Sequence, residues 1–92
     1  MTGRAICKYT LKAVHTQTLE LPRDSKILSV ANHEHDICIW AEVDPKTTER
    51  EEYSVELYAT GETLRHDDSY SFMGTVLMNN GKHVWQLYYK KE

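Results

Sequence analysis

The dipeptide Asn80-Gly81 separates two runs of alternating apolar residues near the C-terminus. A two-residue hairpin loop of type I′ needs a positive φ at both positions, and Asn-Gly is a pair that supplies it readily. This turn predicts four facing pairs across the two strands: Met78 with His83, Val76 with Trp85, Gly74 with Leu87, and Phe72 with Tyr89. Because a slip of one residue would move every side chain to the other face, the hairpin strongly constrains the fold.

One face of this hairpin is apolar and predicts a core surface. Its members are Phe72, Val76, Met78, Trp85, Leu87 and Tyr89, with the small Gly74 beside them. We therefore expect its aromatic side chains to pack inside the domain rather than to bind a ligand. On the reverse face Met73, Gln86 and Tyr88 stay free to meet a neighbour.

The same period of two recurs along the chain. It predicts further strands at residues 7–13, 17–21, 26–31, 37–43 and 53–59. Residues 32–36 are expected to form a polar hairpin loop, and residues 47–52 a charged loop with at most one helical turn. The strand at 37–43 carries apolar residues on both faces, because Cys38 and Trp40 oppose its main apolar face, which is typical of a central strand.

Six to seven short strands without a convincing helix predict an all-β fold. We expect residues 1–92 to form a single small antiparallel β-sandwich or barrel. The length suits one domain with one core.

The composition excludes several classes of function. A formal net charge of −3 without a clustered basic surface argues against binding to duplex nucleic acid. No apolar run approaches the roughly 20 residues needed to span a bilayer. The N-terminal Met-Thr-Gly-Arg stretch lacks the apolar core of a signal sequence, and Cys7 and Cys38 are expected to be reduced thiols. We expect a cytoplasmic protein.

No catalytic motif is found, and we expect neither enzymatic activity nor a cofactor. Cys7 and Cys38 alternate with strand residues as core thiols do, and no glycine-rich phosphate loop occurs. His33 and His35 have ligand chemistry, which His66, Asp67 and Asp68 could complete into a metal site. However, His33 and His35 fall at a hairpin tip, where such residues are common for turn reasons. We therefore favour the turn interpretation over a metal site.

Aromatic residues on outer faces, combined with cations, suggest a site for a nucleotide or a single strand. Trp40, Tyr58 and Tyr88 are candidates to stack on a base. The candidates to meet phosphate are Arg4, Lys8, Arg50 and Arg65. In the alternative interpretation the same aromatics pack in a second layer or in an interface between copies. The apolar surplus on outer faces makes us expect a homo-oligomer.

Several segments in order carry a resemblance to a known family. They are Lys8-Tyr9-Thr10-Leu11, Leu21-Pro22, Trp40-Ala41-Glu42-Val43-Asp44-Pro45, Gly74-Thr75 and Val84-Trp85-Gln86-Leu87. Together they resemble a family of short β-rich domains of unknown function found largely in bacteriophage genomes. These motifs mark positions that define a fold, and the resemblance supplies no active site. The loops at 32–36 and 47–52 differ from the family.

The resemblance implies a non-enzymatic bacteriophage accessory protein that acts by binding in the host cytoplasm. We expect it to antagonise a bacterial anti-phage defence system. One mechanism is a sponge that sequesters a nucleotide signal. The other is inhibition of a host defence protein through the acidic segments at 49–52 and 67–68. The alternative class is a structural or virion-associated β module that assembles without a ligand.

Overall fold

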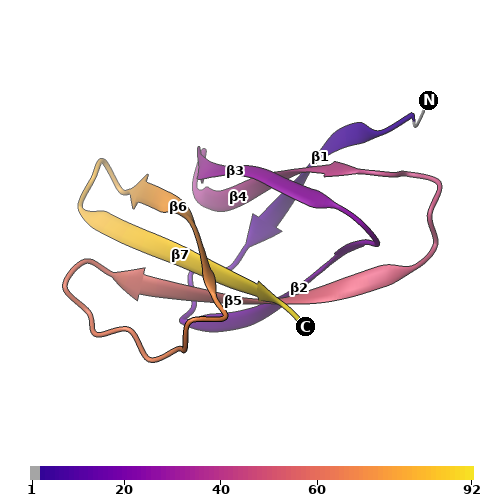
Figure 1. Cartoon of the computed structure of the whole chain (residues 1–92). Coiled ribbons are helices and arrows are strands. Elements are labelled where there is room, and N and C mark those ends of the chain that lie inside the picture. The colour runs from indigo at the N-terminus through magenta and orange to yellow at the C-terminus, as the bar shows by residue number, and fades with distance from the viewer. Residues whose placement is uncertain (1–2) are drawn as a thin grey trace.

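Seven antiparallel strands in two sheets make up the regular structure of a computed structural model that describes residues 3–92. Met1 and Thr2 of the predicted domain lie outside the described residues. The strands are β1 (Ala5–Leu11), β2 (Thr16–Pro22), β3 (Lys26–His33), β4 (Asp36–Val43), β5 (Arg50–Ala59), β6 (Ser71–Met78) and β7 (His83–Lys91). One sheet has the order β1-β4-β3 and the other the order β2-β5-β7-β6 (Figure 1).

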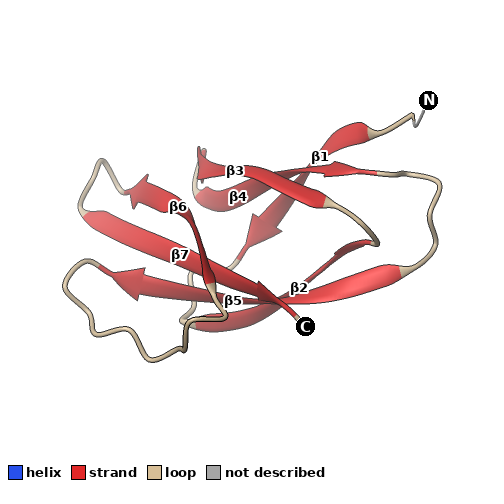
Figure 2. Cartoon of the chain, viewed as in Figure 1, coloured by secondary structure: helices blue, strands red, loops and turns tan. Residues whose placement is uncertain are grey.

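The two sheets pack face to face without closing into a barrel, which confirms the predicted all-β fold as a sandwich. No helix occurs in the part of the chain that the structure describes, so none there could cross a membrane (Figure 2). Alternation along each strand buries one side chain in two between the sheets. The fully covered centre consists of Leu21, Ile39, Ala41, Val55, Leu57 and Leu87, each 0% exposed.

Strand β4 is central in its sheet, as its two apolar faces predicted. Ile37, Ile39, Ala41 and Val43 face the core. Cys38, on the opposite face, is also buried, and its Sγ lies 3.9 Å from Thr10 Oγ1 on the neighbouring β1.

The C-terminal hairpin turns where Asn80-Gly81 predicted. Asn79, Asn80 and Gly81 have φ values of 57°, 58° and 83°, and the Lys82 backbone N–H donates to Asn79 O at 3.1 Å. Asparagine and glycine tolerate this left-handed region better than other residues. The predicted pairs from Met78–His83 to Gly74–Leu87 are present, so the register is confirmed next to the turn.

A β-bulge between Phe72 and Gly74 changes the register further from the turn. It inserts one residue, so Phe72 faces Tyr88 rather than the predicted Tyr89. Phe72 is consequently 55% exposed, whereas Met73 packs against the core. The expectation that Phe72 is core and Met73 free was therefore wrong, although Val76 and Leu87 are buried as predicted.

Two loops are shorter than the sequence suggested. Strand β3 continues to His33, which pairs with Asp36, leaving only Glu34 and His35 in the turn. Strand β5 begins at Arg50, so half of the segment expected to be a loop is paired with the end of β2.

Strands β3 and β6 approach closely where the two sheets meet, and Gly74 lies at this point. A Cβ atom added to Gly74 would stand 2.5 Å from Val30 Cγ1. No real Cβ contact is so short, so this approach requires the absence of a side chain on β6.

Candidate functional site

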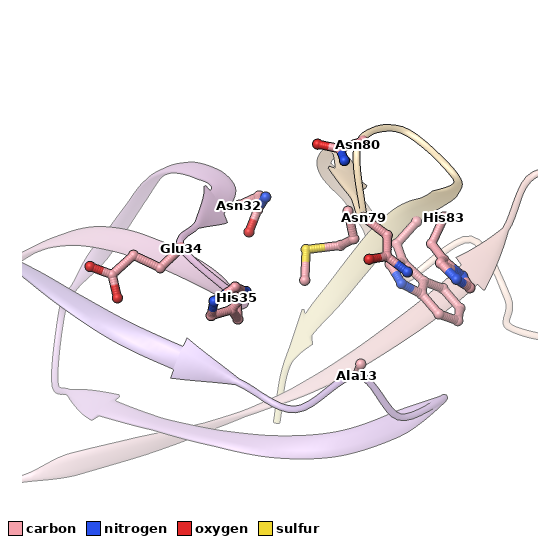
Figure 3. A pocket seen from close by; sticks show the side chains of 9 residues that line it. Ala13, Asn32, Glu34, His35, Asn79, Asn80 and His83 are labelled. Carbon is pink, nitrogen blue, oxygen red and sulfur yellow. The ribbon is translucent and has the colours of Figure 1, made fainter.

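Three connections meet at one end of the sandwich and surround an open cleft of about 560 Å³. The β1–β2 connection contributes Ala13, and the end of β3 with the following turn contributes Asn32, Glu34 and His35. The β6–β7 hairpin contributes Met78, Asn79, Asn80, His83 and Trp85. In Figure 3 the residues of the two turns lie on opposite sides of the cleft, with Ala13 beneath.

The backbone conformation of the two turns determines where several polar side chains of the cleft lie. Glu34, Asn79 and Asn80 all adopt positive φ, with values of 59°, 57° and 58°. His83 and Trp85 are two residues apart on β7, so their side chains project from the same face of the strand. The residues that shape the turns therefore also line the cleft.

The lining is rich in hydrogen-bonding groups and poor in charge. The amides of Asn32, Asn79 and Asn80 offer both donors and acceptors, and the imidazoles add further donor or acceptor atoms. Glu34 is the one charged residue in the lining. Trp85 and Met78 supply apolar surface. A volume of about 560 Å³ is in the usual range for small-molecule sites, so the cleft suits a compact, polar ligand with a flat ring.

A second hollow of about 250 Å³ lies near the cleft, because the two have lining residues in common. The two share His83 and Trp85. The remaining lining consists of Ala59, Thr60, Lys82 and Val84. Lys82 adds the cation that the larger cleft lacks.

Three of the predicted ligand-binding residues come together, but they form a packed cluster. Tyr58 is only 1% exposed. Its hydroxyl donates to Glu56 at 2.7 Å and accepts the Arg65 backbone N–H at 3.1 Å. The Arg65 guanidinium lies 5.3 Å from the centre of the Tyr58 ring, and Tyr88 contacts the same ring edge-on. The Tyr58 ring is therefore not open to stacking by a base.

The segment 60–70 covers this outer face of the β2-β5-β7-β6 sheet, and His66 anchors it. The His66 ring stacks on Tyr70 with centres 4.6 Å apart and lies 4.5 Å from the Tyr88 ring. Its Nδ1 is 2.9 Å from Glu56 Oε1, and because a carboxylate only accepts, Nδ1 carries the proton. The chain itself thus covers Tyr58, one of the outer-face aromatic residues behind the expectation of a homo-oligomer.

The Glu56–His66 contact predicts a pH-dependent stability. Burial would raise the pKa of Glu56, but hydrogen bonds from Tyr58 and His66 and attraction to His66 and His15 hold it below its ordinary value near 4.5. A carboxylate whose pKa is lower in the folded state than in the unfolded state stabilises the fold at pH values above the unfolded-state pKa. This stabilisation is lost as the pH falls through the folded-state pKa. We expect Glu56→Gln to lower the free energy of unfolding by about 1–2 kcal/mol at pH 7.

The measurement is urea denaturation at several pH values. The difference between wild type and Glu56→Gln should shrink below about pH 4.5. Asp68→Asn, at an exposed position of the same segment, is the matched control and should show little difference. A difference for Glu56→Gln that is independent of pH would contradict the role of its charge.

The other predicted cations and Trp40 lie elsewhere. Lys8 is opposite Trp40 in the β1–β4 pairing, on the outer face of the other sheet. Arg4 Nε is 2.6 Å from Glu42 Oε2, so its charge is matched within the domain. Arg50 is exposed at the start of β5. The seven predicted residues therefore do not form one site.

The histidines considered for a metal site are separated. Lys8 Nζ donates to His33 Nδ1 at 3.0 Å, whereas His35 lines the cleft. His66 packs on the other sheet. Within residues 3–92, no group of three His, Cys, Asp or Glu side chains is arranged to hold a metal ion.

Most residues of the cleft were not predicted as site residues from the sequence. Asn32, Glu34, Asn80 and His83 were predicted as turn or strand residues, Asn79 was not singled out, and Trp85 was assigned to the core alone. Trp85 does pack against the core, but it also lines both hollows. A usable signal was the shared composition of the two hairpin tips, which both combine Asn with His.

Comparison with known proteins gives a match to one family model over residues 2–92, nearly the entire chain. The model is described as a domain of unknown function, DUF7352. The searches of curated proteins and of solved structures found no match.

Proposed function

The chain belongs to the DUF7352 family, and from this premise we propose that it is a non-enzymatic binding protein whose ligand occupies the cleft between the two hairpin tips. The observation that carries the proposal is the lining itself. Three amides, two imidazoles and one indole from distant parts of the chain converge on a space of ligand size. Small-molecule sites combine polar groups that fix the orientation of the ligand with an aromatic or apolar surface, and this lining supplies both.

The make-up of the lining supports binding without chemistry. The cleft presents no hydroxyl or thiol nucleophile among its described residues. Its carboxylate, Glu34, sits on an exposed turn. The groups present can hold and orient a ligand, so sequestration is the favoured activity.

We place this binding in bacteriophage antagonism of bacterial defence, within the host cytoplasm, on the strength of the sequence resemblance. The cleft favours capture of a small signal molecule, with a nucleotide as one candidate, over inhibition of a host protein. The acidic segment proposed for the second mechanism is partly neutralised, because Glu49 pairs with Arg23 at 2.6 Å and Glu51 with Lys91 at 3.1 Å.

Trp85 provides the test. The chain has two tryptophans, so Trp40→Phe leaves Trp85 as the single indole fluorophore. Titration of this variant with a panel of nucleosides, nucleotides and sugars should change its emission, and a bound compound should raise the melting temperature by mass action. Replacing Trp85 by alanine in this variant should weaken binding about tenfold, measured by calorimetry because no indole remains, since base–aromatic stacking contributes about 1–3 kcal/mol by alanine substitution.

Trp40→Phe alone is the matched control, because Trp40 lies on the outer face of the other sheet. It should leave affinity unchanged. A panel that neither shifts the melting temperature nor alters Trp85 emission would overturn the proposal. Detection of the protein in purified virions, with that flat panel, would favour the alternative of a structural assembly module.

A further inference from the structure

We infer that the hollow beside Lys82 is an anion subsite continuous with the cleft, so that the ligand carries a single anionic group next to its uncharged ring. This inference rests on the proposed function, because it names the chemical class of the ligand for the same site. The two hollows meet at His83 and Trp85, which line both. A ligand against Trp85 can therefore extend into either.

The charges of the two hollows differ. The larger cleft holds the carboxylate of Glu34 and neither Lys nor Arg in its lining, so an anion placed there is repelled. The smaller hollow holds Lys82, which forms no ion pair within residues 3–92 and is exposed. Lys82 is the one lysine or arginine in the two linings, so an anionic group is expected on the Lys82 side, which sets the direction in which the ligand lies.

Thr60 adds a donor for the anion. Its Oγ1 accepts a hydrogen bond from Gln86 Nε2 at 3.0 Å, which leaves its hydroxyl hydrogen free to donate. His83, next to Lys82 in the chain, can donate a ring N–H to the same hollow. An ammonium, a hydroxyl and an imidazole around a hollow of about 250 Å³ suit one phosphate or carboxylate group.

Lys82 is a single cation, so it also limits how much negative charge the site can match in a ligand. The chain has a net charge of −3, so its overall field does not attract anions. A polyphosphate would leave most of its charge unmatched by Lys82. We therefore expect monophosphates or monocarboxylates of ring compounds to bind in preference to their triphosphates.

The test uses matched neutral and phosphorylated pairs, namely nucleosides and hexoses with their monophosphates, titrated by calorimetry. Each monophosphate that binds should do so about tenfold more tightly than its neutral partner, because a charge-assisted hydrogen bond to an anion is roughly twice as strong as a neutral one. Lys82→Gln should abolish this gain, so that the two members of a pair then bind with similar affinity. Raising the salt concentration should reduce the gain in wild type.

Lys90→Gln is the matched control, because Lys90 lies over Tyr70, away from both hollows. It should keep the preference for the monophosphate. Equal binding of both members of a pair, or a preference that survives Lys82→Gln, would overturn the anion subsite while leaving the proposed function intact. If no member of any pair binds, and the wider panel also fails, the proposed function and the subsite fall together.

Discussion

Leu87→Ala is expected to lower the free energy of unfolding by about 3 kcal/mol, within the range of about 2–5 kcal/mol seen for buried leucines. Leu87 is 0% exposed and lies on β7, between its partners Leu57 on β5 and Gly74 on β6. Truncation removes apolar contacts and leaves a cavity between the two sheets, where close packing allows only partial relaxation. Urea denaturation with linear extrapolation measures the loss.

Leu77→Ala is the matched control, since Leu77 lies on the neighbouring β6 but is 56% exposed. Its effect should stay within about 0.5 kcal/mol. Similar losses for both variants would mean that the core does not lie between the sheets as described.

Gly74→Ala has the second large expected effect, a loss of about 1–3 kcal/mol, as for other overpacked positions. The added Cβ would stand 2.5 Å from Val30 Cγ1, so either the side chain of Val30 or the backbone of β6 must move. The β-branched Val30 has little rotamer freedom with which to escape. Thermal and urea denaturation report the loss.

A double-mutant cycle tests the cause. Val30→Ala removes the methyl group that Gly74→Ala would meet, so the double variant should be more stable than the sum of the single losses predicts. The coupling should be about 0.5–3 kcal/mol, the range for residues in contact. Strict additivity would show that Gly74 is required for its backbone conformation and not for the close approach to Val30.

The alternation of apolar residues was enough to predict the fold class and the approximate position of each strand. It also predicted that β4 is central, because Cys38 makes the second face of this strand apolar as well. The hairpin register followed from Asn80-Gly81, since turn chemistry and the apolar face agreed. In each of these cases a local pattern determines the structure.

The bulge at Met73 was not predictable from the pattern. Phe72 and Met73 are both apolar, so either can occupy a core position without an unfavourable hydrophobic cost. The bulge lies next to Gly74, whose close approach to Val30 joins two residues distant in sequence. Periodicity describes neighbours along a strand and does not contain such a contact.

The candidate site was less predictable than the fold. Tyr58, Arg65 and Tyr88 were among the predicted ligand-binding residues, and they lie together, but the segment that carries Arg65 and His66 covers Tyr58. The cleft depends on which loops share an end of the sandwich, and that follows from strand order. Pairing between β1 and β4, and between β5 and β7, cannot be read from a single sequence.

The direction of β7 has a practical consequence. It begins at His83, which lines the cleft, and ends at Lys91, and in Figure 1 the C-terminus lies away from the β6–β7 turn. Likewise β1 begins at Ala5 and ends at Leu11, two residues before Ala13 of the cleft. Both ends of the described chain therefore point away from the cleft. A tether or an affinity tag at either end leaves the cleft open to solution, so the protein can be attached to a biosensor surface in two independent orientations.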